Sequence, residues 1–255
     1  MIRFFVGSEN ITEEHIYLDD PQDMKHLTKV LRARVGDKVS ISDGEAWEYV
    51  TEIGEIGSTE VILNILEKSP FLREPETRVT LYQGIPKAAK LETIVQKTVE
   101  LGVYKIVPVF MSRTVVEDKG KFHKKQERLQ KIADEAVKQC KRGIIPEVSD
   151  AMDFSGMIED IKANNFDGVI LAYESEEGFT IKDAIRDSEG DLNIKKGSRL
   201  ALVIGPEGGF EEEETETVKD IFGRKAAIVS LGKTILRTET AGMAALAMIM
   251  YELEL

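Results

Sequence analysis

Residues 202–214 read LVIGPEGGFEEEE, an apolar run that meets a glycine-rich turn and then a block of carboxylates. Apolar runs of this kind are typical of strands in an open α/β sheet, where ligands collect at the carboxyl ends of the strands. The glycine offsets differ from those of the dinucleotide fingerprint, and Pro206 removes a backbone donor. The carboxylates favour the start of a helix but repel phosphate. The turn therefore favours a nucleoside that lacks phosphate and carries positive charge, such as S-adenosylmethionine, although a tight turn capped by an acidic helix explains the glycines as well.

A second loop, SLGKTILRTETA at residues 230–241, follows the next apolar run along the chain. Thr238 is placed to cap the last helix. Ile235 and Leu236 are apolar residues in a loop, where an adenine could rest against them. The alternative is that both side chains fill the core beneath the loop. Arg237 has no obvious helical partner and points to contact with a ligand or an anion.

The rest of the chain divides into two patterns. Short runs rich in β-branched and aromatic residues predict a small barrel or curled sheet over residues 1–71, interrupted by one helix from Pro21 to about Arg34. The segment SPFLREPE, with its two prolines, is typical of a linker. Over residues 75–255 apolar strands alternate with amphipathic helices, which predicts an α/β domain with a mostly parallel sheet covered on both faces.

Charge is unevenly distributed along the chain. The net charge of −12 argues against nucleic-acid binding over the whole surface. Two stretches are nevertheless basic, residues 25–38 and 119–142, and basic faces on an acidic body suit a protein that meets a polyanion at defined places. Charge alone leaves open that these side chains merely solvate helix faces.

Cysteine and histidine usage bears on compartment and metal binding. Cys140 is the single cysteine, so no internal disulfide can form and the chain fits a reducing compartment. The three histidines lie far apart without neighbouring ligands, so the sequence predicts no metal site. No leader or membrane-spanning run is evident, and we expect a cytoplasmic protein with no membrane partner.

The two loops together resemble a known pair of motifs. LVIGPEGGF followed by SLGKTILRTETA is similar to the loops of the RsmE family, RNA methyltransferases of the SPOUT class that modify N3 of a uridine in 16S ribosomal RNA. Residues 26–44, HLTKVLRARVGDKVSISDG, resemble the PUA-like RNA-binding domain of that family. Residues 83–116 and 132–148 resemble blocks of its catalytic domain, so the similarity extends over nearly the whole chain.

The resemblance implies a fold and a set of ligands. It implies a small PUA-like β-barrel followed by a parallel-sheet SPOUT domain with a deep trefoil knot, S-adenosylmethionine bound in the knot, and a homodimer whose chains complete each other's active sites. The chain departs from the family pattern at Lys233, Thr234, Leu129 and Cys140. These departures put the local loop shape in question. The donor-binding positions that match are Leu171, Ile204, Gly205, Gly209, Ser230, Leu231, Gly232, Ile235, Leu236 and Arg237.

Catalysis on a uridine would need a cation beside the oxygens of the base. Loss of the N3 proton spreads negative charge onto O2 and O4, which a fixed guanidinium stabilises. Arg237 is the first candidate, and Arg142 or Arg113 from either chain comes next. Glu207 lies in the right loop for a general base, but we favour a role in holding the turn. The predicted contacts with 16S RNA, within the small ribosomal subunit, are Lys29, Arg32, Arg34, Arg113, Lys124, Lys125 and Arg142.

Three other functions compete with this hypothesis. Related knotted proteins methylate ribose or guanine, but the full-length resemblance weighs against another target atom. A ribosome-assembly factor that binds RNA without transfer would not need the glycine loops and Arg237. A nucleotide-dependent oxidoreductase is disfavoured by the missing fingerprint and by the acidic helix start.

Overall fold

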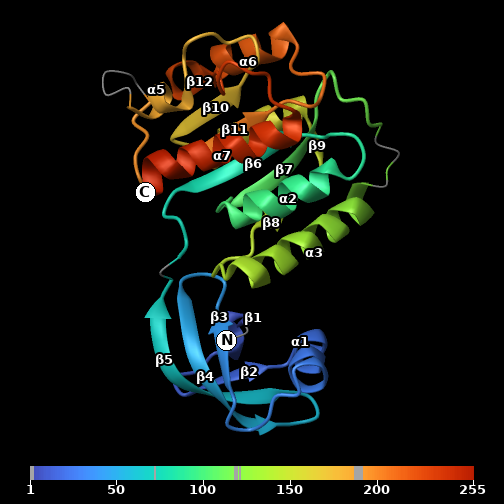
Figure 1. The fold of residues 1–255 in the computed structure, drawn as a ribbon, viewed down its shortest axis with the longest axis vertical. Coiled ribbons are helices and arrows are strands. Elements are labelled where there is room, and N and C mark those ends of the chain that lie inside the picture. Colours follow the sequence, from blue (N-terminus) through green and yellow to red (C-terminus); the bar gives the residue numbers. More distant parts are fainter. Residues whose placement is uncertain (1–2, 72, 118–119, 121, 187–191) are drawn as a thin grey trace. The chain divides into compact units, whose positions relative to one another are not determined.

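The computed structural model of the chain describes residues 3–71, 73–117, 120, 122–186 and 192–255. The chain divides into two compact units (Figure 1). The first is formed by Met1–Glu74 with Val137–Ile145, and the second by Pro75–Ala136 with Pro146–Leu255. The predicted domains, 1–71 and 75–255, do not anticipate that residues 137–145 join the first unit.

The first unit is built on a five-stranded sheet in the order β1-β3-β4-β5-β2. Side chains alternate between buried and more exposed along β2 and β4, as in a sheet with one face on a core. Two register irregularities bend β4 against β5, at Val50/Thr51 and Ile53/Glu55. Among the described residues β1 and β2 do not pair with each other, so the sheet is a half-barrel. The strands are β1 (Arg3–Phe5), β2 (His15–Leu18), β3 (Lys38–Ser42), β4 (Trp47–Ile56) and β5 (Val61–Pro70).

The helix predicted from Pro21 to Arg34 is shorter than expected. Asp20 caps α1 (Pro21–Lys25), and a π-helical turn, η2 (His26–Val30), continues it. Arg32 then takes a left-handed conformation with φ 53°, which ends the helix. A single 3-10 turn, η1 (Ser8–Asn10), precedes β2. Lys29 therefore lies in η2, whereas Arg32 and Arg34 lie beyond the helix in the loop before β3.

A buried ion pair fixes residues 137–145 to the first unit. Arg142 pairs with Glu74 at 2.9 Å, and the two side chains are 7% and 8% exposed. Glu74 also accepts from the backbone N–H of Gly143 at 2.6 Å, and Arg3 donates to the Arg142 carbonyl at 3.0 Å. The guanidinium of Arg142 is enclosed with a carboxylate, which disfavours the predicted catalytic and RNA-binding roles of this residue.

The second unit is a seven-stranded sheet in which every pairing is parallel. The order is β12-β10-β11-β6-β7-β8, with β9 also on β7. Nearly all residues of β10 and β11 are buried, as the continuous apolar runs predict. The strands are β6 (Arg78–Gly84), β7 (Lys105–Phe110), β8 (Glu147–Val148), β9 (Met152–Asp153), β10 (Gly168–Ala172), β11 (Arg199–Ile204) and β12 (Ala226–Val229).

Helices cover both faces of this sheet. Side chains of α4 and α6 pack into one core with Tyr82 and Phe166, while α7 lies against β6 and β11 and contacts α2 and α5 (Figure 1). The sequence analysis missed α4, although Asp153 caps it by accepting from the Gly156 N–H at 2.7 Å. The helices are α2 (Lys90–Glu100), α3 (Phe122–Cys140), α4 (Phe154–Asn164), α5 (Ile181–Arg186), α6 (Glu212–Phe222), the 3-10 turn η3 (Gly223–Lys225) and α7 (Thr238–Glu254).

The last segment of the chain returns across the sheet. After β12 at one edge, residues 230–237 lead back to α7, which packs over β11 and β6. This return places the start of α7 beside the carboxyl ends of strands formed much earlier in the sequence. The trefoil knot implied by the resemblance stays a prediction.

Candidate functional site

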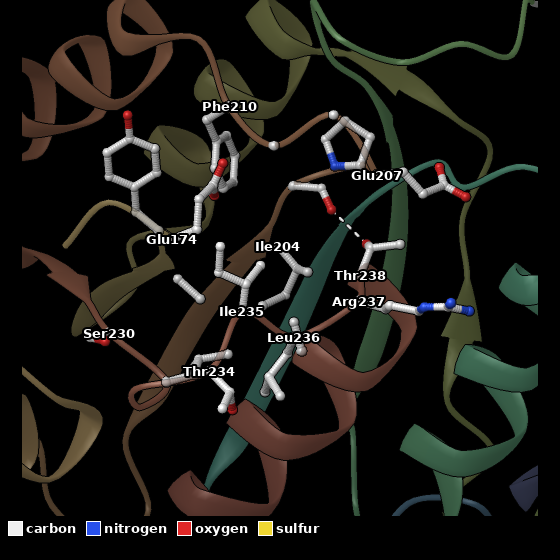
Figure 2. A pocket seen from close by; sticks show the side chains of 18 of the residues that line it. Glu174, Ile204, Glu207, Phe210, Ser230, Thr234, Ile235, Leu236, Arg237 and Thr238 are labelled. Atoms are coloured by element: carbon white, nitrogen blue, oxygen red, sulfur yellow. Dashed lines mark hydrogen bonds between the residues drawn. The ribbon is translucent and has the colours of Figure 1, made fainter. Parts of the chain in front are cut away.

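A cavity of about 510 Å³ opens at the carboxyl ends of β10, β11 and β12 (Figure 2). This is the edge of a parallel sheet at which ligands bind, and the volume is ordinary for a small-molecule site. Three segments, residues 172–174, 204–210 and 230–238, supply most of its walls, with Lys90 and Ala241 at the margin.

The cavity gathers the donor-binding positions predicted from the sequence, except Leu171. Leu171 is fully buried in the core, and its neighbour Ala172 lines the cavity instead. The side chain of Leu171 therefore does not line the cavity, and its donor-binding role stays a prediction. The predicted positions that do line the cavity are Ile204, Gly205, Gly209, Ser230, Leu231, Gly232, Ile235, Leu236 and Arg237.

Ile235 resolves the alternatives left open for the second loop. Its side chain is 82% exposed and faces the cavity beside Ile204 and Leu236 (Figure 2). Ile235 therefore does not fill the core beneath the loop. An exposed aliphatic side chain on a cavity wall is suited to an apolar flat surface such as a nucleobase.

Gly209 is favoured in the first loop by its backbone conformation, and the carboxylate of Glu174 lies close to it. Its φ of 71° lies in the left-handed region, and a Cβ there would collide with the Glu174 carboxylate. The glycine therefore permits both the turn and the close approach of an acid from the end of β10.

Glu207 holds the loop onto the start of α2. It accepts from the backbone N–H of Lys87 at 3.0 Å and from Lys90 Nζ at 3.0 Å. Burial raises the pKa of Glu207, but the bonds from Lys90 and Lys87 outweigh it and the pKa lies below its usual value. A carboxylate stabilised in this way is a weaker base, so the predicted catalytic role of Glu207 is disfavoured and the turn-holding role is favoured.

Arg113 holds the other side of the same loop. Its Nε and Nη2 donate to the two carboxylate oxygens of Glu211, both at 2.9 Å, and its Nη1 donates to the Gly208 carbonyl at 3.1 Å. Such a bidentate pair is geometrically specific. The guanidinium predicted to contact RNA or the reacting base is instead occupied in shaping the loop.

Glu214 explains much of the acidic block. It completes a capping box with Glu211 at the start of α6 and also accepts from the Ser112 N–H at 3.0 Å. Its side chain is buried. The carboxylates of Glu207, Glu211 and Glu214 thus anchor the loop to two other segments, the start of α2 and residues 112–113 after β7, in addition to favouring the helix dipole.

The start of α7 is bonded to the ends of β6 and β11. Thr238 Oγ1 donates to the Gly205 carbonyl at 2.6 Å, drawn as a dashed line in Figure 2. Gln83 Nε2 in turn donates to Thr238 Oγ1 at 2.8 Å, and all three groups are buried. Thr238 therefore joins the two predicted loops.

Arg237 lies on the cavity, on the opposite side from Glu174 (Figure 2). The side chain is exposed. Its guanidinium makes no hydrogen bond or ion pair with any residue that the structure describes. Arg237 is therefore available to a ligand, unlike Arg113 and Arg142.

The remaining predicted RNA contacts are surface residues of two segments. Lys29, Arg32 and Arg34 are exposed in the first unit, and Lys124 is exposed on α3. Lys125 is half-buried with Nζ 5.5 Å from the Phe122 ring centroid, and burial lowers its pKa. Lys125 is the least suited of these to bind phosphate.

Sequence reasoning missed several residues on the cavity. Tyr173 and Glu174 follow β10, Phe210 follows the glycines, and Lys90 opens α2. The run DGVILAYE predicts a strand whose carboxyl end should meet the same edge, a signal that could have found Glu174. No local pattern links Lys90 to the loop. Within the described ranges, no helix has both the length and the apolar character needed to cross a membrane.

Two family profiles match the chain. One, described as an RNA methyltransferase domain, covers residues 73–250, and one described as an RNA methyltransferase PUA domain covers residues 18–66. Ribosomal RNA small subunit methyltransferase E of Bacillus subtilis (strain 168) is 34% identical over 261 residues, which is 100% of this chain and 98% of the relative.

Two solved structures similar to this chain contain bound S-adenosylmethionine. A ribosomal RNA small subunit methyltransferase E from Neisseria gonorrhoeae, bound to S-adenosyl methionine, superposes with a TM-score of 0.80 at 27% identity, over 99% of this chain and 98% of that one. A putative methyltransferase from Legionella pneumophila, in complex with the cofactor SAM, has a TM-score of 0.77 at 28% identity, over 98% and 97%.

Proposed function

This chain belongs to the ribosomal RNA small subunit methyltransferase E family, and on that premise we propose that it methylates N3 of a uridine in 16S ribosomal RNA. The enzyme is an S-adenosylmethionine-dependent RNA methyltransferase. The observation that carries the proposal is the full-length similarity at 34% identity together with a cavity in which both family motifs meet.

The residues of the cavity fit S-adenosylmethionine. Ile235 and Leu236 offer an apolar wall for the adenine, and the backbone around them is available to bond its edge. Glu211 and Glu214 cap the start of α6. The N-terminus of this helix is therefore not available to bind a phosphate group of a ligand. The walls therefore suit an unphosphorylated nucleoside. Bound there, S-adenosylmethionine would supply a methyl group activated by its sulfonium.

Arg237 is the residue that we assign to the reacting base. Its free, exposed guanidinium borders the cavity and can donate two parallel hydrogen bonds. Placed beside O2 or O4 of uracil, it stabilises the negative charge that develops as N3 loses its proton. The rigid start of α7, bonded through Thr238 to Gly205, fixes where this side chain begins.

RNA binding is assigned to the exposed cations of the first unit and of α3. Lys29, Arg32, Arg34 and Lys124 meet the phosphate backbone, which contributes affinity without reading sequence. The reaction takes place in the cytoplasm, on RNA of the small subunit. Two copies of the chain act together, and exposed apolar residues of α7, Met248 and Tyr251, are the surface that we assign to their contact.

Methyl transfer from labelled S-adenosylmethionine tests the proposal directly. The acceptors are small subunits that lack the modification, naked 16S RNA and transfer RNA, and the nucleosides are then separated by mass. We expect 3-methyluridine on small subunits or 16S RNA and none on transfer RNA. Methylation of another atom would overturn the target assignment, and donor binding without transfer to any acceptor would favour a binding role.

A further inference from the structure

Glu174 is an acid on the cavity wall that the mechanism above does not use. It lies two residues beyond β10, beside Phe210 and across the cavity from Arg237 (Figure 2). Its carboxylate approaches the backbone of Gly209 so closely that a Cβ at that position would collide with it. The side chain is exposed, so its charge faces the space that a ligand would occupy.

The carboxylate of Glu174 is not bonded to any part of the chain that the structure describes. Three neighbouring acids, Glu207, Glu211 and Glu214, are each bonded to another segment. Glu174, in contrast, makes no hydrogen bond or ion pair with any described residue. A negative charge that holds nothing in place is free to act on a ligand.

One cation, Arg113, lies within electrostatic reach of Glu174. The pKa of Arg113 is raised chiefly by its hydrogen bond to Glu211 and further by the charge of Glu174. The Arg113 donors, however, are directed to Glu211 and to the Gly208 carbonyl. Glu174 is therefore only partly compensated, and the charge that it adds to the cavity remains negative.

The donor and the product of methyl transfer differ in charge at one atom. S-adenosylmethionine carries a positive sulfonium, whereas S-adenosylhomocysteine lacks the transferred methyl group and has a neutral thioether in its place. We propose that Glu174 makes the cavity prefer the cationic donor over the neutral product, so that spent product is bound less tightly than fresh donor. This inference rests on the proposed function, since it takes S-adenosylmethionine as the ligand.

The size of the preference follows from exposure. A single charge pair in a solvent-exposed cavity is attenuated by water and salt, so we expect Glu174 to favour the donor about fivefold. A neutral isostere, Glu174→Gln, removes the charge and keeps the shape. Because the carboxylate has no bonds to lose, the variant should melt at the wild-type temperature.

Isothermal titration of the full chain with S-adenosylmethionine and with S-adenosylhomocysteine measures the effect. The matched control is Glu177→Gln, which removes the same charge from an exposed acid three residues along that does not line the cavity. We expect Glu174→Gln to weaken donor binding about fivefold and to leave product binding within twofold, while the control changes neither. Added salt should lower the ratio of donor affinity to product affinity in the wild type. It should leave this ratio unchanged in Glu174→Gln.

Equal weakening of both ligands would overturn the inference, because Glu174 would then contact a part that donor and product share. Wild-type affinities of Glu174→Gln for both ligands would overturn it as well, because the charge would then affect neither ligand. Either result would leave the proposed function standing, provided that the wild type binds the donor and transfers its methyl group. A wild type that binds neither ligand would overturn both proposals.

Discussion

At the scale of single residues, Ile235 carries the clearest prediction about donor binding. Its side chain is 82% exposed and makes a cavity wall, so its apolar surface becomes buried only when a ligand is bound. Ile235→Ser should weaken S-adenosylmethionine binding by about 1–2 kcal/mol, roughly five- to thirtyfold, because that burial is lost. Titration calorimetry gives the affinity, and thermal melting checks the fold.

A control variant separates this effect from a general loss of exposed apolar surface. Val115→Ser changes another exposed aliphatic residue, 59% exposed and away from the cavity lining. It should leave donor affinity unchanged. Equal affinities for Ile235→Ser and the wild type would show that the adenine does not rest on this side chain.

Arg237 is predicted to act on the rate rather than on the fold. Arg237→Ala should lower kcat by about 10²- to 10³-fold, the usual cost of one preorganised donor at a developing oxyanion. Because the guanidinium makes no hydrogen bond or ion pair with a described residue, the melting temperature should stay within about a degree of the wild type. Arg237→Lys keeps the positive charge but loses the planar guanidinium and its two parallel donors, so it should recover only part of the rate. Normal turnover by Arg237→Ala would remove this residue from the mechanism.

The pair of Lys90 and Glu207 gives a prediction that depends on pH. The pKa of Glu207 is lowered in the folded chain, so its contribution to stability is present above its ordinary value near 4.5 and is lost as pH falls through the folded pKa. Lys90→Met should therefore lower the melting temperature at pH 7 and lower it little at pH 3. Melting curves of both proteins from pH 7 to pH 3 check this. A gap between the two proteins that is constant across this range would mean that the pair does not hold the loop.

The residue scale also shows what could be predicted from the sequence. Nine of the ten predicted donor-binding positions line the cavity, and the exception is Leu171, which is buried in the core. The roles of the charged residues were predicted less well, since Arg142 and Arg113 are bonded to Glu74 and Glu211. Sequence proximity does not report such pairs, because their partners lie about seventy to a hundred residues away.

At the scale of elements, the start of α6 depends on Glu214. This buried side chain accepts from the N–H of Glu211 and from the N–H and hydroxyl of Ser112. Glu214→Ala should lower the free energy of unfolding by about 1–3 kcal/mol, because buried donors lose their acceptor. Denaturant titration measures the loss. Glu213→Ala, an exposed acid in the same first turn, should change the free energy of unfolding far less, and equal losses in the two variants would argue against the anchoring role.

Elements were predictable where one physical signal dominated. The continuous apolar runs DGVILAYE (residues 167–174), RLALVIG (199–205) and AAIVSLG (226–232) predict β10, β11 and β12 close to their observed bounds, since burial on both faces leaves little room for other patterns. The helix after Pro21 was predicted too long, because a π-helical turn and the left-handed Arg32 end it without a glycine or proline signal. The order of strands in the sheet does not follow from any local pattern, because it depends on pairings distant in sequence.

At the scale of the whole molecule, the exposed arginines of the first unit predict how RNA affinity responds to salt. Arg32 and Arg34 make no side-chain bond to any described residue, so both are free to meet phosphate. Replacing both with Ala should reduce the slope of log affinity against log salt by about 1.4, at roughly 0.7 per contact on single-stranded RNA. Fluorescence anisotropy with a 16S RNA fragment at several salt concentrations measures the slope.

The control for this experiment removes the same charge elsewhere. Lys182→Ala combined with Lys219→Ala takes two exposed cations from α5 and α6, outside the predicted RNA surface. The slope should then stay close to that of the wild type. If both double variants reduce the slope equally, net charge rather than a defined surface governs RNA binding.

The first unit is built from two separate segments of the chain, which affects how it can be exchanged between genes. Because Arg142 and its loop belong with Glu74 and the half-barrel, the first unit is encoded by two stretches of gene separated by the coding sequence for residues 75–136. A single recombination after codon 74 would join a new half-barrel to a segment that still carries the old Arg142. The buried guanidinium would then meet a foreign partner, at a cost of several kcal/mol if that partner lacked a carboxylate. Exchanging the whole first unit between genes therefore requires three crossovers, one after codon 74 and one on each side of codons 137–145, so the two units should share one evolutionary history.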